Sequence, residues 1–224
     1  MNIKYNKKKQ EMKKDPVLDW LFSAKEYAKK NSVLLIGALL VLLFIGAVSV
    51  FSSRAREADI RQSQDLFARA VLEFNDENLD DAIVLFGDAA NNFGNTPQGK
   101  MSAFMLGSIY FEQQKYLQAI EWFQLAVTNM SSAGFVGAQA LVGIATSHEA
   151  LGNEAEAMQY YERALRDQRI SFNHASIRWK MALLSAPSDT QRSQTLLQEI
   201  ISDPEATDYH SKAQNFLASL TKAG

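Results

Sequence analysis

Three segments of this 224-residue chain repeat one arrangement: a small residue, an aromatic residue and a second small residue, spaced i, i+4 and i+7. On an α-helix, residues with this spacing share one face. Small side chains on that face let another helix approach closely, and the aromatic ring fills the space between helix pairs. Successive copies start 37 and 38 residues apart, which is typical of stacked helical repeats. The copies are Ala82, Phe86 and Ala89, then Ala119, Phe123 and Ala126, then Ala157, Tyr161 and Ala164.

Helix-breaking residues separate these segments. Gly152 followed by Asn153 predicts a helix end and a tight turn, and Gly94 with Pro97 predicts a break between two repeats. Gly107 lies inside a predicted helix, where glycine costs about 1 kcal/mol relative to alanine. We therefore expect the backbone of another helix to pack against Gly107.

These residues resemble the tetratricopeptide repeat, a helix–turn–helix unit of about 34 residues. Residues 100–131 match the family pattern best and residues 138–169 match it next. Residues 63–94 match in the second helix only, because Arg69 and Glu73 stand where the family has apolar or aromatic residues. The matching positions of the two better units are Leu106, Gly107, Tyr110, Ala119, Phe123 and Ala126, then Ile144, Ala145, Gly152, Ala157, Tyr161 and Ala164.

The resemblance weakens toward the C-terminus. Residues 174–202 are expected to form a degenerate fourth unit, and residues 205–221 a closing helix. The whole repeat domain is therefore expected to span residues 63–224.

A second feature is an uncharged apolar run from Val33 to Phe51. As a helix this run is about 28 Å long, close to the hydrocarbon thickness of a bilayer, about 30 Å. We expect residues 33–51 to form a transmembrane helix and residues 52–62 a helical stalk. The predicted fold class is all-α: one transmembrane helix followed by a tetratricopeptide-type antiparallel helix-pair solenoid.

The apolar run has an alternative interpretation as a cleaved signal peptide. Ala47 and Ser49 are small and spaced like a weak cleavage site, and cleavage there predicts a mature chain that begins near Val50. The run is longer than the usual signal-peptide core of about 7–15 residues. An uncleaved signal anchor is therefore the favoured interpretation.

Charge is distributed unevenly around the apolar run. Residues 1–32 contain nine lysines and four acidic residues, a net charge of +5, and the rest of the chain is acidic. Positive residues stay on the cytoplasmic side of a membrane. This predicts a cytoplasmic N-terminus and a C-terminal domain across the bacterial inner membrane, in the periplasm. The reverse topology, with cytosolic repeats, is the alternative.

The basic tail, residues 1–32, also contains a possible interfacial helix at residues 16–30. Trp20 and Tyr27 suit the headgroup region of a bilayer. The alternative is a basic flank that only sets topology. Val17, Leu18, Leu21, Phe22, Ala24 and Ala28 are expected on one helical face, with Lys25, Lys29 and Lys30 elsewhere.

The tetratricopeptide resemblance also implies a protein-binding groove. In that family the first helix of each unit lines a concave surface. The corresponding positions are Gln64, Phe67, Val71 and Phe74 in the first unit, Met101, Phe104, Ser108 and Phe111 in the second, and Gln139, Val142, Thr146 and Glu149 in the third.

This set is apolar and aromatic with few charges, and it lacks the Lys, Arg and Asn clamp with which some family members hold a terminal carboxylate. We expect the groove to bind an apolar segment or an amphipathic helix. The alternative is that these aromatic residues pack against neighbouring helices.

Catalytic motifs are absent from the sequence. The chain has no cysteine, and its three histidines lie on separate predicted helices without metal-ligand spacing. It has no nucleophile elbow, P-loop or dinucleotide-binding glycine pattern. We expect no enzyme activity, no cofactor, no metal, no small-molecule substrate and no nucleic-acid partner.

A basic tail, a single signal anchor and a small tetratricopeptide domain resemble the ancillary Sec-translocon subunit family of bacterial inner membranes. That resemblance implies protein partners, namely the translocon and periplasmic chaperones or assembly factors. The alternative function is an envelope scaffold for cell-wall or outer-membrane assembly.

Overall fold

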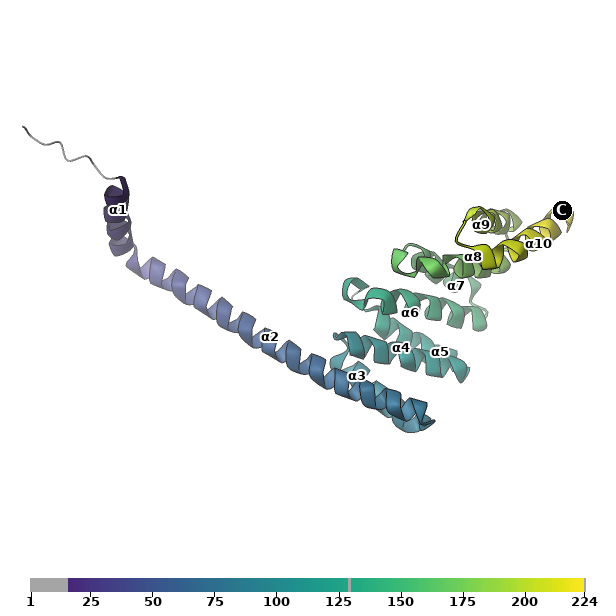
Figure 1. Ribbon diagram of the computed structural model, residues 1–224, viewed down its shortest axis with the longest axis horizontal. Helices are drawn as coiled ribbons and strands as arrows, with labels where there is room; N and C mark the ends of the chain where they lie inside the picture. Colours follow the sequence, from purple (N-terminus) through teal and green to yellow (C-terminus); the bar gives the residue numbers. More distant parts are fainter. Residues whose placement is uncertain (1–15, 129, 224) are drawn as a thin grey trace, which may run out of the picture. The chain divides into compact units, whose positions relative to one another are not determined.

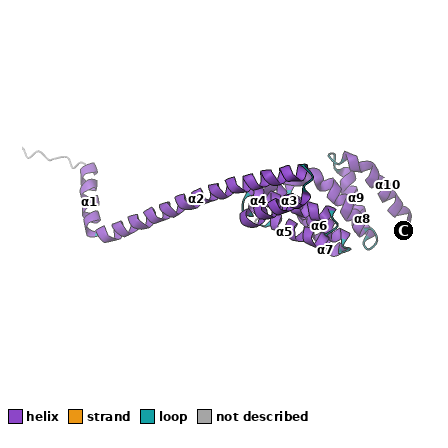
Figure 2. Ribbon diagram, turned by 90° about the horizontal axis from the view of Figure 1, so that it is seen from below, coloured by secondary structure: helices purple, strands orange, loops and turns teal. Residues whose placement is uncertain are grey.

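The computed structural model describes residues 16–128 and 130–223, which form ten α-helices, one short 3-10 helix and no strand (Figures 1 and 2). The all-α fold class is therefore confirmed. The first fifteen residues of the basic tail lie outside the described residues. The helices are α1 (Pro16–Lys30), α2 (Ser32–Asn75), α3 (Leu79–Phe93), α4 (Pro97–Glu112), α5 (Tyr116–Val127), α6 (Met130–Ala150), α7 (Glu154–Leu165), η1 (Gln168–Asn173), α8 (His174–Ser185), α9 (Thr190–Ser202) and α10 (Thr207–Ala223).

The chain divides into two compact units, residues 1–56 and residues 57–224. Within the first unit, α2 carries the apolar run and continues without a break into the second unit as far as Asn75. Among the described residues, α2 is the one helix long and apolar enough to cross a membrane, and none of its apolar stretch is buried by the protein. The chain thus has one long apolar N-terminal helix with the properties of an anchor or a signal.

In the second unit, consecutive helices pack antiparallel as stacked pairs (Figure 1). The first pair is the C-terminal part of α2 with α3, and the next three are α4 with α5, α6 with α7 and α8 with α9, followed by α10. The aromatic residues of the repeated pattern, Phe86, Phe123 and Tyr161, are all buried in the core. The structure therefore confirms that the repeated face of α3, α5 and α7 is a packing face.

Two hydrophobic clusters make up this core, and α6 contributes to both. Ala140 and Ile144 pack with the helices from α2 to α5, whereas Leu141 and Ala145 pack with the helices from α7 to α10. The 3-10 helix η1 contacts α6, α7 and α8 and separates the third helix pair from the fourth. Helix α6 is kinked at Gly134, whose φ is 56° and ψ is −143°, so its regular part, which carries the third unit, begins after Gly134.

The ring of Phe123 explains the glycine inside α4. A Cβ atom at Gly107 would lie 2.5 Å from this ring, and one at Gly143 in α6 would lie 2.6 Å from it. The expectation that a backbone packs against Gly107 is therefore wrong, because an aromatic side chain occupies that space. Gly107 in α4 and Gly143 in α6 thus leave room between them for the Phe123 ring of α5.

The turns inside the first three helix pairs share one backbone conformation. Glu77, Gln114 and Gly152 have positive φ angles of 64°, 60° and 76°, and each lies two residues before a helix start. The turn predicted at Gly152 is confirmed. Left-handed conformations favour glycine, because a Cβ atom approaches the following carbonyl oxygen there. The two non-glycine turns are therefore strained.

Replacing Gln114 with glycine is expected to stabilise the protein by about 0.5–1 kcal/mol, since relief of the left-handed strain exceeds the added entropy of the unfolded chain. The measurement is thermal unfolding of the detergent-solubilised protein followed by circular dichroism. Gln118→Gly, inside α5, is the matched control and is expected to destabilise by about 1 kcal/mol. Equal losses in both variants would contradict the account.

Candidate functional site

A shallow recess of about 230 Å³ lies between α4 and α6, the first helices of the second and third helix pairs. Of the twelve predicted groove positions, the structure brings six together here, three from α4 and three from α6. The recess also includes Glu112, Phe123 and Gly143, which were not predicted as groove residues. The six predicted residues are Phe104, Ser108, Phe111, Gln139, Val142 and Thr146.

Aromatic rings shape this recess. The centroid of the Phe104 ring lies 5.6 Å from that of Phe123, and the two planes are inclined by 53°. The Phe111 ring packs against Tyr116, with 5.4 Å between centroids. Phe104 and Phe111 are both half-buried, so each is held from behind and keeps an exposed edge. Such fixed and partly exposed rings suit the anchoring of an apolar ligand.

The hydroxyl groups in the recess are occupied by their own helices. Ser108 Oγ donates to the carbonyl of Phe104 at 3.1 Å, and Thr146 Oγ1 donates to the carbonyl of Val142 at 2.9 Å. Both hydroxyl groups therefore already have an acceptor for their proton and do not need one from a ligand. The recess is effectively an apolar surface with the amide of Gln139 and the carboxylate of Glu112 at its margin.

The other six predicted groove residues do not line this recess, and Gln64 among them is exposed on α2. Phe67 packs against Phe86 with 5.8 Å between ring centroids, and Val71 lies beside the same core cluster. Phe74 is exposed at the end of α2, and Met101 is half-buried near the start of α4. In the first unit, packing against the core covers Phe67 and Val71, two of the positions from which a groove was expected.

Glu149, the last predicted groove residue, belongs to a polar network. Tyr161 Oη donates to Glu149 Oε2 at 2.6 Å, and Lys180 Nζ lies 3.4 Å from the same oxygen. Thr146 Oγ1 lies 3.2 Å from Tyr161 Oη. Burial, and then the hydrogen bond to Glu149, raise the pKa of Tyr161 well above its ordinary value. The network joins α6, α7 and α8 through a buried Tyr161 and the partly exposed Glu149 and Lys180.

We expect Tyr161→Phe to lower the free energy of unfolding by about 1–2 kcal/mol, because the hydrogen bond to Glu149 is lost while the ring remains. The pH dependence gives a second readout. The pKa of Tyr161 is higher in the folded state, so its stabilising effect is complete below about pH 10 and falls as the pH rises further. Denaturant unfolding between pH 8 and 11 should therefore show a steeper alkaline loss in the wild type than in Tyr161→Phe. Parallel curves would contradict this role for Tyr161.

Two exposed phenylalanines beside the recess were missed at the sequence level. Phe135 precedes Gln139, Val142 and Thr146 on α6 at helical spacing, so it shares their face. Its ring stacks on Phe172 of η1, with 5.9 Å between centroids and 19° between planes. Phe172 is 64% exposed. Continuing the α6 pattern four residues toward its N-terminus would have identified Phe135.

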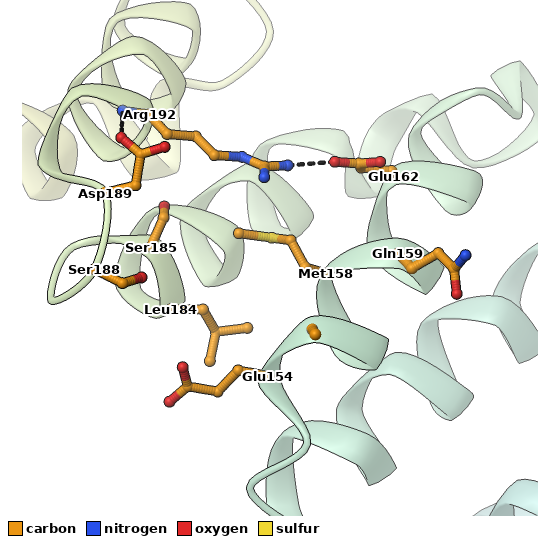
Figure 3. Close-up of a pocket in the computed structure, with 10 residues that line it drawn as sticks. Glu154, Met158, Gln159, Glu162, Leu184, Ser185, Ser188, Asp189 and Arg192 are labelled. Atoms are coloured by element: carbon orange, nitrogen blue, oxygen red, sulfur yellow. Dashed lines mark hydrogen bonds and ion pairs between the residues drawn. The ribbon is translucent and has the colours of Figure 1, made fainter.

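A larger cleft of about 430 Å³ lies between α7 and the α8–α9 pair (Figure 3). Arg192 spans it to form an ion pair with Glu162, and Asp189 caps α9 by accepting from the backbone amide of Arg192 at 2.9 Å. Met158 and Leu184 are apolar residues of its lining, and Leu184 lies toward Glu154 (Figure 3). Because its charged side chains Arg192 and Glu162 already pair with each other, this cleft is a weaker candidate for binding than the α4–α6 recess.

The three histidines have structural contacts. His174 Nε2 donates to the carbonyl of Asp167 at 3.1 Å, and His210 Nε2 donates to the carbonyl of Asp203 at 2.7 Å. His148 stacks on Tyr160. In residues 16–128 and 130–223, no group of three His, Cys, Asp or Glu side chains is placed to hold a metal ion.

Residues 100–170, which cover the helices from α4 to α7, match the sequence model of the tetratricopeptide repeat family. A comparison with curated proteins finds no match. The chain therefore contains a tetratricopeptide repeat domain at residues 100–170, and the recess lies within it. Domains of this family are protein–protein interaction modules and are usually non-catalytic scaffolds.

Proposed function

We propose that the chain is a membrane-anchored interaction protein that binds an apolar segment or an amphipathic helix of a partner in the α4–α6 recess. The observation that carries this proposal is the pair Phe104 and Phe111, each packed from behind and each leaving one edge in the recess. An amphipathic helix binds such a surface through apolar residues spaced three or four apart. Phe135, one helical turn before Gln139 on α6, and Phe172 stacked on it add exposed aromatic rings outside the recess lining.

The proposed anchor is residues 33–51 of α2, with the N-terminus in the cytoplasm and the repeat domain in the periplasm of a bacterial inner membrane. The length, hydropathy and exposure of this stretch support a bilayer span. The lysine-rich flank supports the orientation.

Within this class, we favour an ancillary translocon subunit that links secretion to periplasmic chaperones or assembly factors. The support is the layout of basic tail, anchor and tetratricopeptide domain. The alternative, an envelope scaffold for cell-wall or outer-membrane assembly, predicts a different set of partners for the same recess.

Quantitative co-purification tests the proposal. The full chain is solubilised in mild detergent, captured through a C-terminal tag, and its partners are identified by mass spectrometry. Phe111→Ser should lose most of the specific partners, whereas Val84→Ser, an exposed residue of α3, should retain them. Translocon and chaperone components among the lost partners support the favoured function, and cell-wall components support the scaffold. Identical partner sets in both variants would contradict binding in the recess.

A further inference from the structure

We propose that α1 is a membrane-surface helix that binds the anionic headgroups of the leaflet from which α2 enters the bilayer. This inference rests on the proposal that α2 spans the membrane. It assigns a specific lipid partner to a helix that a topology signal alone would not require.

The aromatic side chains of α1 are exposed, as are the other side chains of this helix whose burial is described. Trp20 is 69% and Tyr27 is 63% exposed, and Val17 and Leu21 are exposed as well. At 100° per residue, Tyr27, Trp20, Ala24, Val17, Ala28 and Leu21 follow one another around an arc of about 120° of the helix. An exposed apolar arc with indole and phenol groups at one edge suits the boundary between headgroups and acyl chains.

The charged residues fit a negatively charged surface. At helical spacing, Lys25 and Lys29 lie between Leu21 and Phe22, at one edge of the apolar arc. The expectation that these lysines lie away from the apolar face is therefore wrong. Lysines at such an edge extend their ammonium groups to the headgroups while their methylenes stay in the apolar layer. Glu26 lies on the opposite side of the helix, away from an anionic surface.

The connection to α2 places α1 at the correct depth. Only Asn31 separates Lys30 from Ser32, and the uncharged run begins at Val33. The backbone amide and the side-chain amide of Asn31 donate to the carbonyl of Tyr27 at 3.0 and 3.1 Å. The junction therefore keeps its hydrogen bonds, and α1 ends where the hydrocarbon layer is expected to begin. The net charge of +5 on residues 1–32 adds attraction to anionic lipid.

Spin-label accessibility in the full chain tests this inference. The sequence has no cysteine, so single cysteines at Ala24, in the apolar arc, and at Glu26, opposite to it, can be labelled without background. The chain is reconstituted in nanodiscs of phosphatidylcholine with or without phosphatidylglycerol. With the anionic lipid, the label at residue 24 should be accessible to oxygen and protected from a water-soluble nickel chelate, and the label at residue 26 should show the reverse.

The lysines provide the specificity test. Combining Lys25→Gln, Lys29→Gln and Lys30→Gln should remove the protection at residue 24, and discs of phosphatidylcholine alone should weaken it. Equal nickel accessibility at residues 24 and 26 in anionic discs would overturn the inference. A label at Leu42 reports separately on α2: protection there with exposure at residue 24 refutes only the surface helix, whereas exposure there refutes the anchor.

Discussion

Replacing Phe123 with alanine is expected to lower the free energy of unfolding by about 3–5 kcal/mol, the range for truncating a fully buried phenylalanine. The ring is nearly completely buried and fills the space between Gly107 and Gly143. Since neither glycine has a side chain that can move into the vacated space, the cavity should persist. Denaturant unfolding of the detergent-solubilised protein measures the loss.

Phe172→Ala is the matched control for Phe123→Ala. The same atoms are removed from a ring that is 64% exposed, so the expected loss is about 0.5 kcal/mol or less, typical of surface substitutions. Similar losses in the two variants would show that Phe123 does not hold α4 and α6 together. The Phe123 variant should also weaken partner binding, because Phe104 loses the ring behind it.

Introducing three arginines into the apolar run of α2 is expected to release the protein from the membrane. Each arginine near the centre of a spanning helix costs about 2.5–3.5 kcal/mol, and Leu39, Leu42 and Ile45 all lie in that stretch. Together these costs exceed the favourable insertion energy of the remaining residues, at about 0.3–0.6 kcal/mol each. Alkaline extraction followed by flotation through a density gradient measures attachment.

The control places three arginines in the repeat domain instead, at Leu72, Val84 and Leu117, which are exposed apolar residues. This variant should float with the membranes like the wild type. If the variant with arginines at positions 39, 42 and 45 also floats and resists extraction, the protein is attached by some other element, and the proposed span is incorrect.

The helical repeat was predictable from sequence because it depends on local periodicity. The small–aromatic–small pattern identified three core helices, and the buried Phe86, Phe123 and Tyr161 confirm its interpretation. The turn at Gly152 was also predictable, since glycine marks a left-handed residue. The equivalent turns at Glu77 and Gln114 carried no such signal.

The candidate site was only partly predictable, because a unit position specifies the face of a helix and not what covers that face. Phe67 shares the predicted face but packs against Phe86. Glu149 is engaged by Tyr161 and Lys180, which lie 12 and 31 residues further along the chain. Such contacts depend on how whole helices dock, and residue spacing does not encode them.

Site-specific photo-crosslinking in living cells tests whether a protein partner occupies the α4–α6 recess. A photoreactive amino acid replaces Phe104 or Phe111, and a matched variant carries it at Val84 on α3. We expect discrete adducts with the same partner from both recess positions and none from position 84. Adducts of equal yield from all three positions, or no adduct from either recess position in the folded and membrane-attached protein, would contradict this expectation.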